Sequence, residues 1–337
     1  MNELPRLAPN TCPAPPNWHN SHLAHKTLNT IMITPHSMSR ILTLSAHMLR
    51  EHEDPGKFLA WIATHGPAIL PELAAMTHSE HESNGLFRML GIQIYNHMPL
   101  ERNSFQLAPI PRPAPNAPCD CGSELKYKRC CKTLEMFKET PDFGNLLFYS
   151  LSSYTNKDLA MLPDTRINTQ DLAAVAWELF DAGEDRRLLA LLEPWFKPGV
   201  ELNKRQVPLF DLMADLYFEL GNPIKRKRLI ERVCQSRYKP LAAEGWMRKA
   251  SMEMDTNKPA DAWRSFSKAQ QLDPDSPNLC VLEVTMLWSE QRLAELKSRA
   301  QFWLTRLKRN RNTPPEVLEI IEICCHDPAS LFGQELF

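Results

Sequence analysis

Glycine, net charge and long apolar runs are all scarce in this sequence. Its 337 residues include only 11 glycines, and β-branched residues rarely alternate with polar ones, so the pattern does not favour β-sheet. Leucine, alanine, methionine and charged residues recur at helical spacing instead, which predicts an all-α protein. The formal net charge is -1, so any attraction to nucleic acid or acidic lipid has to come from local patches.

Membrane-spanning and secretory segments are not expected. No stretch approaches the roughly 20 apolar residues of a membrane-spanning helix, and the N-terminus, MNELPRLAPNTCPAPP, lacks the apolar core of a signal peptide. We therefore expect a cytoplasmic protein with no membrane partner. The nine cysteines agree with a reducing compartment, since four of them lie within thirteen residues. Such a cluster is too tight for a disulfide scaffold and is typical of a metal site.

Composition and periodicity divide the chain into five segments. Residues 1–35 are predicted to be a loosely ordered, proline- and histidine-rich N-terminus, and residues 36–104 a small domain of three or four helices. Within 105–118 the run PIPRPAPNAP has five prolines in ten positions, which predicts an extended spacer that insulates the following segment from these helices. A cysteine-rich knuckle follows at 119–132, and helices resume over 133–337.

Apolar residues at helical spacing predict three core-facing surfaces in the small helical domain. They are formed by Ile41, Leu44, Met48 and Leu49, by Phe58, Leu59 and Ile62, and by Leu86, Met89, Leu90 and Ile94. Pro55, Pro67 and Pro71 stand near predicted helix starts, where the N–H that proline lacks would have no intrahelical acceptor.

Residues 165–310 show weak internal repetition. In the clearest unit, 243–276, small residues stand where two antiparallel helices would approach and large residues fill the space beside them: Trp246, Ala250, Ala262, Phe266, Ala269 and Pro274. Two earlier units carry Leu172, Val175, Ala176, Leu179 and Gly183, and Phe210, Met213, Ala214, Tyr217 and Gly221. The stretch resembles the tetratricopeptide repeat family; an unrelated array of helical hairpins is the alternative. Either arrangement would present a concave surface to a peptide or partner helix.

The knuckle sequence NAPCDCGSELKYKRCC spans residues 116–131. It contains the pattern C-x-C, eight residues, then C-C, formed by Cys119, Cys121, Cys130 and Cys131. Zinc binds four thiolates in a tetrahedron, with Zn–S distances of about 2.3 Å, and Gly122 and Ser123 allow the chain to turn back. So short a segment buries too little apolar surface to fold alone, so zinc binding and folding would be coupled. The simpler alternative is a set of buried thiols without metal.

These residues resemble the SEC-C motif, first described at the C-terminal tail of the bacterial translocase ATPase SecA. The positions that agree in type and spacing are Asn116, Pro118, Cys119, Cys121, Gly122, Ser123, Lys126, Tyr127, Lys128, Cys130 and Cys131. Asp120 stands in place of a proline and Glu124 in place of a glycine, and neither change removes a ligand. The resemblance implies one structural zinc ion and a docking element for proteins or the ribosome in a bacterial-type protein. Catalytic zinc is not expected, because four cysteines leave no coordination position open for water.

Basic residues surround the knuckle and recur in two later helices. The four at the knuckle are Lys126, Lys128, Arg129 and Lys132. They either offset the negative charge of a zinc tetrathiolate and donate toward its sulfurs, or form a basic face for an acidic partner or RNA phosphates. The runs Lys225, Arg226, Lys227, Arg228, Arg232, Arg237 and Lys239, and Arg306, Lys308, Arg309 and Arg311, are either solvated helix faces or a nucleic-acid-binding stripe.

Two other clusters are weaker candidates. The histidines His19, His22 and His25, then His78 and His81, have no cysteine or acidic partner nearby in the sequence and are predicted to be surface residues. Cys324, Cys325 and His326 end an amphipathic helix, where one or both cysteines are predicted to be small buried hydrophobes. No phosphate-binding glycine loop, G-x-S-x-G or H-E-x-x-H occurs, so no catalytic residue is predicted.

The sequence therefore predicts a zinc-binding adaptor that docks a protein partner through the knuckle and a tetratricopeptide-like groove. The first alternative is a ribosome- or RNA-associated factor that uses the basic knuckle and basic helices. The second, an enzyme with its site in the N-terminal region, has no supporting constellation. Binding to phosphates would weaken steeply with salt, whereas an apolar groove contact would change little.

Overall fold

The computed structural model describes residues 33–52, 54–111, 113–119, 125–130, 132, 143–310 and 313–332. Throughout these ranges the regular structure is helical, without a β-strand, which confirms the all-α class. The chain forms two compact units that divide between Pro194 and Trp195. In the described part, no helix is both long and apolar enough to cross a membrane.

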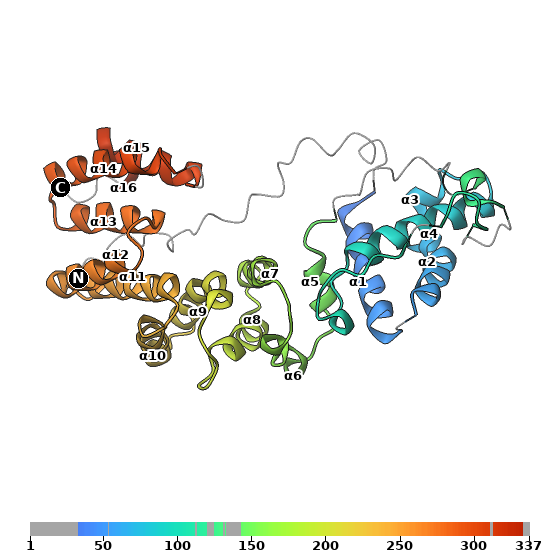
Figure 1. Ribbon diagram of the computed structural model, residues 1–337, viewed down its shortest axis with the longest axis horizontal. Coiled ribbons are helices and arrows are strands. Elements are labelled where there is room, and N and C mark those ends of the chain that lie inside the picture. Colours follow the sequence, from blue (N-terminus) through green and yellow to red (C-terminus); the bar gives the residue numbers. More distant parts are fainter. Residues whose placement is uncertain are drawn as a thin grey trace. The chain divides into compact units, whose positions relative to one another are not determined.

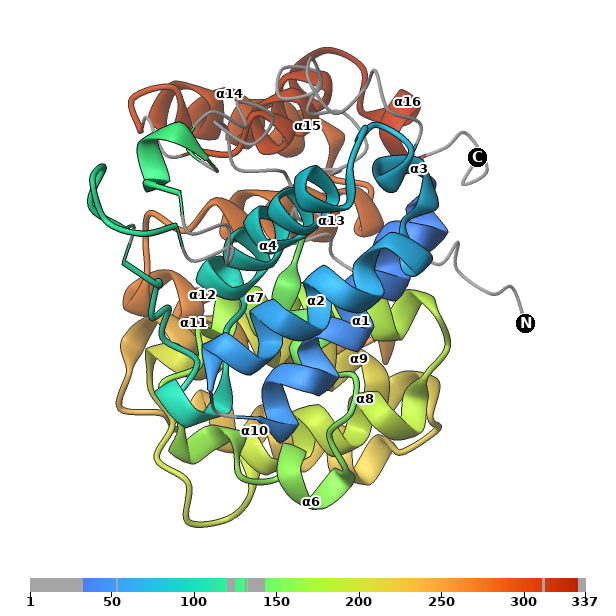
Figure 2. The same ribbon diagram turned by 90° about the vertical axis from the view of Figure 1, so that its right-hand side faces the viewer.

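The N-terminal unit begins with α1 (Pro35–Glu51), α2 (Pro55–Ile69), α3 (Pro71–Ala74) and α4 (Glu80–His97). Proline is the first residue of α1, α2 and α3, as predicted for Pro55 and Pro71. Pro67 does not start a helix. It lies near the end of α2, which stops at Ile69, and a proline inside a helix removes an intrahelical hydrogen bond. The long helix α2 packs against both α1 and α4 (Figure 2).

The crossing of α2 and α4 is close because each helix carries a glycine at the contact. A Cβ atom at Gly66 would clash with the ring of Phe87, and one at Gly91 would lie 2.7 Å from Ile62. The predicted apolar faces point into the core around this crossing. Their buried members are Ile41, Leu49, Phe58, Leu59, Ile62, Leu86, Leu90 and Ile94, while Leu44, Met48 and Met89 are half-buried.

The same core also holds residues from beyond the knuckle. Leu100 belongs to it before the knuckle, and Phe143 and Leu146 belong to it afterwards. The helix α5 (Leu146–Leu151) packs against α1. The predicted domain boundary at residue 133 is therefore not the division between the two units, because the chain leaves and re-enters one core around the knuckle.

The rest of the N-terminal unit consists of α6 (Asn156–Leu159), α7 (Thr169–Asp181) and α8 (Asp185–Leu192). The last two were expected to begin the repeat array. They belong to the N-terminal unit, so the predicted array over 165–310 is shared between both units.

The C-terminal unit is a succession of helices, which run from yellow to red in Figure 1. They are α9 (Val207–Glu219), α10 (Pro223–Cys234), α11 (Lys239–Asp255), α12 (Pro259–Leu272), α13 (Pro277–Ser289), α14 (Leu293–Leu307), α15 (Pro315–His326) and α16 (Pro328–Phe332). Each helix packs against the next. In addition, α9, α11, α13 and α15 pack against one another in order, so alternate helices form a layer of their own.

A recurrent turn separates the helices of four pairs. Gly183, Gly221, Asn257 and Gln291 have φ values of 69°, 64°, 56° and 58°, and each stands two residues before the next helix begins. After each of them, the following N–H donates to the carbonyl five residues earlier, as from Glu184 to Leu179 and from Arg292 to Leu287, the helix-ending pattern of the Schellman motif. These positions are 38, 36 and 34 residues apart, so helical hairpins repeat along the chain.

The residues of the clearest repeat unit lie at the contact between α11 and α12. Those predicted to pack there are buried: Ala250, Ala262, Phe266 and Ala269. Trp246 differs, since it is half-buried. The ammonium groups of Lys249 and Lys268 lie 4.8 and 4.1 Å from the centroid of its ring, so this indole covers the edge of the core rather than filling its centre.

Candidate metal-binding knuckle

The knuckle is held by backbone pairing between two short segments. Pro118 and Lys126 form an isolated antiparallel bridge. Beside it, the N–H of Cys119 donates to the carbonyl of Leu125 over 2.8 Å. This pairing holds Cys119, the first predicted ligand, next to the segment that leads to Cys130, the third predicted ligand.

A 3₁₀ turn, Tyr127–Arg129, then carries the chain to Cys130. The N–H of Tyr127 donates to the carbonyl of Ala117, and that of Cys130 donates to the carbonyl of Tyr127. As a result Cys119 and Cys130, which are 5% and 9% exposed, pack in one small buried cluster edged by Met89 and Tyr127. Two of the four predicted zinc ligands are therefore neighbours.

The other two predicted ligands, Cys121 and Cys131, lie outside the described residues, together with Gly122 and Ser123. Across the described ranges, no group of three or more His, Cys, Asp and Glu side chains is arranged to hold a metal. The four-cysteine site therefore remains a prediction, and the described residues include two of its four ligands.

The knuckle rests on helix α4. Met89 of α4 packs against the two cysteines, and the Nε2 atom of His81, in the first turn of α4, lies 3.6 Å from the Sγ atom of Cys130. In the proline-rich segment, the N–H of Ile110 donates to Asn96 Oδ1 over 2.8 Å. The segment 105–118 therefore does not insulate the knuckle, because both the segment and the knuckle contact α4.

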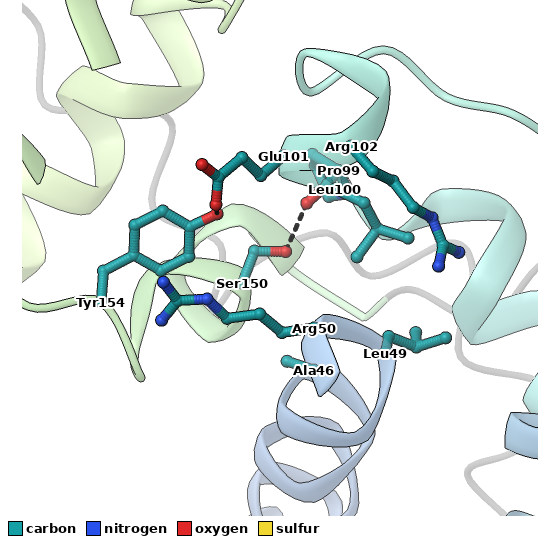
Figure 3. Close-up of a pocket in the computed structure, with 9 residues that line it drawn as sticks. All are labelled: Ala46, Leu49, Arg50, Pro99, Leu100, Glu101, Arg102, Ser150 and Tyr154. Carbon is teal, nitrogen blue, oxygen red and sulfur yellow. Dashed lines mark hydrogen bonds between the residues drawn. The ribbon is translucent and has the colours of Figure 1, made fainter. Parts of the chain in front are cut away.

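A cavity of about 280 Å³ lies where the chain leaves the helical core and where it returns. Figure 3 shows its lining, which comes from α1, from the turn before the spacer, from α5 and from the turn after α5: Ala46, Leu49, Arg50, Pro99, Leu100, Glu101, Arg102, Ser150 and Tyr154. The Ser150 hydroxyl donates to the Pro99 carbonyl, and the Tyr154 hydroxyl donates to Glu101 Oε2 over 2.9 Å. These two bonds join the chain on either side of the knuckle.

The polar groups of this cavity are already engaged with one another. Arg50 stacks 4.1 Å from the centroid of the Tyr154 ring and pairs with Asp158 over 2.9 Å. Burial, together with the hydrogen bond to Glu101, raises the pKa of Tyr154. The hydrogen bond from Arg50 lowers the pKa of Asp158 to about 2. These contacts therefore stabilise the point where the chain leaves the first core and the point where it returns, on either side of the knuckle.

The basic residues of the knuckle form an exposed face. Lys126, Lys128, Arg129 and Lys132 are all exposed. None of them is within ion-pair distance of an acidic side chain in the described part of the chain. The positive charge of this face, which we call the basic face, is therefore not neutralised by described neighbours.

The basic helices are different. On α14, Arg306 pairs with Asp275 over 2.5 Å; just beyond that helix, Lys308 lies 3.5 Å from Glu322. On α10, burial lowers the pKa of Arg226. Arg311 lies outside the described residues. Acidic partners and burial therefore interrupt the predicted basic stripe.

The remaining sequence candidates do not form sites. Cys324 is fully buried, and burial raises its pKa to about 12, which confirms a buried thiol and disfavours a nucleophile. Cys325 is half-buried. His19, His22 and His25 lie outside the described residues. His81 is exposed, as predicted for a surface residue, but its contact with Cys130 links residues 49 positions apart, and no local pattern predicts it.

No protein family, curated protein or solved structure matches this chain.

Proposed function

We propose that this protein is a zinc-binding adaptor that docks an acidic protein partner. One observation carries the proposal: the knuckle buries Cys119 and Cys130 side by side, and the same short segment carries a basic face that has no ion pair with described residues. Two soft sulfur donors in one small cluster fit a thiophilic metal such as zinc. The cluster has little apolar surface of its own, so a metal would supply the stability that the knuckle lacks.

In this proposal Cys119, Cys121, Cys130 and Cys131 hold one Zn²⁺ as thiolates. Four sulfur ligands close the coordination shell, so the ion has a structural role and supplies no activated water. The basic face then docks the partner. The repeated hairpins of the C-terminal unit support a second contact, since stacked helix pairs of the tetratricopeptide kind present a concave surface to a partner segment.

The metal is tested by its stoichiometry. Protein purified without chelator is expected to contain about one Zn²⁺ per chain, and the Cys119→Ser and Cys130→Ser variants are expected to contain almost none. Cys280→Ser is the matched control, because Cys280 is fully buried in the C-terminal unit and far from the knuckle in sequence. Near-zero zinc in the wild-type protein would contradict the proposal.

The partner is tested by changing charge. In one variant the four residues of the basic face are replaced by alanine. In the control, four exposed cations of α10, of the start of α11 and of the segment between them are replaced: Lys227, Arg228, Arg237 and Lys239. Capture from native lysate is expected to fail for the first variant, persist for the control, and resist nuclease.

Loss of capture after nuclease treatment would favour the RNA or ribosome alternative. The basic face suits phosphates as well as carboxylates, so this alternative rests on the same four side chains. Capture that survives in both charge variants would exclude the basic face altogether.

A further inference from the structure

The start of α4 is fixed by its own capping groups. The N–H of Glu82 donates to Ser79 Oγ over 3.2 Å, and the N–H of His78 donates to Glu82 Oε2 over 2.8 Å. These contacts order the first helical turn. His81 is the second residue of this turn, so its backbone position is defined before any contact with the knuckle.

His81 and Met89 share one face of α4, because residues eight positions apart are close to two helical turns apart. Met89 packs on the Cys119–Cys130 cluster, and His81 Nε2 lies 3.6 Å from Cys130 Sγ. One face of α4 therefore contacts the cysteine cluster at two points. At one of these points the contacting atom is the His81 Nε2 nitrogen, whose N–H can donate to the sulfur of Cys130, a predicted zinc ligand.

A zinc-bound thiolate carries no proton and accepts hydrogen bonds, and such contacts orient metal ligands and tune their affinity. The distance of 3.6 Å suits an N–H···S hydrogen bond. We propose that His81 is a positioning residue of the zinc site, and that its Nε2–H donates to the Cys130 thiolate. This inference rests on the proposed function, and it adds that the metal site is built from two segments, the knuckle and α4.

Two consequences follow from this arrangement. Zinc in the knuckle further stabilises the first turn of α4, which its capping groups already order, and a more stable first turn strengthens zinc binding, since such coupling is reciprocal. The stability of the N-terminal helices would then depend on whether the knuckle holds zinc, although these helices supply no zinc ligand.

The test uses the full chain and a competing chelator. His81→Ala is expected to bind zinc ten- to a hundred-fold more weakly, with about one ion per chain still bound in the absence of competitor. His78→Ala is the matched control, because His78 is exposed like His81 and close to it in sequence; the zinc affinity of this variant is expected to change less than about twofold. His81→Gln is expected to be intermediate, since its amide N–H can donate to sulfur.

A second measurement distinguishes an effect of local unfolding in α4 from an effect of losing the His81–Cys130 hydrogen bond. Stripping zinc is expected to speed amide exchange at residues 80–84 in the wild type and in His78→Ala, and to change it little in His81→Ala. Equal zinc affinities for His81→Ala and His78→Ala would overturn the inference. So would a cobalt(II) spectrum that changes donor set in His81→Ala, because His81 would then be a ligand. If Cys130→Ser retains zinc, the proposed function fails instead, whatever His81 does.

Discussion

In the C-terminal unit one apolar core extends from Met247 to Cys324 and includes two large indoles, whereas the buried cluster of the knuckle contains two cysteines. The C-terminal unit also places charged groups inside, with Arg248 held between Asp211 and Asp215. The knuckle keeps its cations at the surface. Apolar burial stabilises a helical array without a ligand, whereas we propose that a knuckle of this size depends on a bound metal and on the helix that supports it.

This contrast assigns different roles to the two regions. A region stabilised by its own core can present a surface without changing shape. A region stabilised by a ligand is ordered only when the ligand and its supporting helix are present. The predictions below test the self-sufficiency of the C-terminal unit and then the dependence of the knuckle, from the largest expected effect to the smallest.

The largest effect is expected for Trp303→Ala. Trp303 is 1% exposed and its indole N–H donates to Glu283, which is also buried. Removing the ring leaves a cavity, while Glu283 keeps its ion pair with Arg299, so the free energy of unfolding should fall by about 3–5 kcal/mol. The neighbouring Phe302 is 45% exposed, and Phe302→Ala should cost less than about 1 kcal/mol. Urea denaturation of both variants measures the difference; equal losses would contradict the assigned core.

A somewhat smaller effect is expected for Arg248→Met. Arg248 lies 2.7 Å from Asp215 and 3.2 Å from Asp211, and it is 6% exposed. Removing the cation leaves two carboxylates close together in a buried site, which should cost about 3 kcal/mol. Arg264→Met removes an exposed pair with Asp261 and should cost less than about 1 kcal/mol. A loss below about 1 kcal/mol for Arg248→Met would show that the buried pair contributes little to the array.

Much of this division between core and surface follows from the sequence. Helical periodicity identified the all-α class and the core positions Ile41, Phe58 and Leu90, and small residues identified Ala250 and Ala262. Such signals are local: they report which face of a helix is apolar. Gly183 and Gly221 were recognised within the repeats, but the equivalent turns at Asn257 and Gln291 were not, since residues other than glycine rarely adopt positive φ.

Contacts distant in sequence could not be predicted in the same way. The proline-rich run indicated a spacer, and proline does favour extended backbone. It does not show whether that backbone lies free or rests on a helix, as Ile110 does on α4. The contact of His81 with Cys130 and the return of Phe143 to the first core depend on tertiary packing. The pattern of cysteines identified the candidate site, whereas its support by α4 is visible only in the fold.

A moderate, pH-dependent effect is expected for Glu244→Gln. Burial, followed by the nearby charge of Asp211, raises the pKa of Glu244 to about 8 from 4.5. The folded protein therefore favours the protonated carboxyl, and its stability falls as pH rises from about 4.5 through 8. Glutamine is neutral at every pH and can still accept from Asn278, which lies 3.3 Å from the carboxylate.

Denaturation at pH 5 and pH 8.5 tests this expectation. The gain in stability of Glu244→Gln over the wild type should be larger at pH 8.5, by about 1 kcal/mol or more. Glu319→Gln is the control, because Glu319 is exposed, and its effect should not change between the two pH values. A gain that is equal at both pH values would mean that Glu244 ionises normally in the fold.

The smallest effect is expected for the C-terminal unit when the knuckle loses its metal. One core cluster of that unit is composed of residues from Trp246 to Phe332, and this cluster contains no knuckle residue. Replacing Cys130 and Cys131 by serine should abolish zinc binding and weaken partner capture. Most of the helical circular dichroism and the main melting transition should remain, with the midpoint shifted by no more than about 1 °C, because the stabilising interactions of this core are unchanged.

Hydrogen exchange should locate the change that does occur. Because Cys130 contacts His81 and its cluster contacts Met89, faster exchange should extend from the knuckle into the start of α4. It should not reach α11–α14. If the double variant instead unfolds the whole protein in one step, the stability of both units depends on zinc. The contrast between a self-sufficient array and a metal-dependent knuckle would then be wrong, and docking through the knuckle would lose its main support.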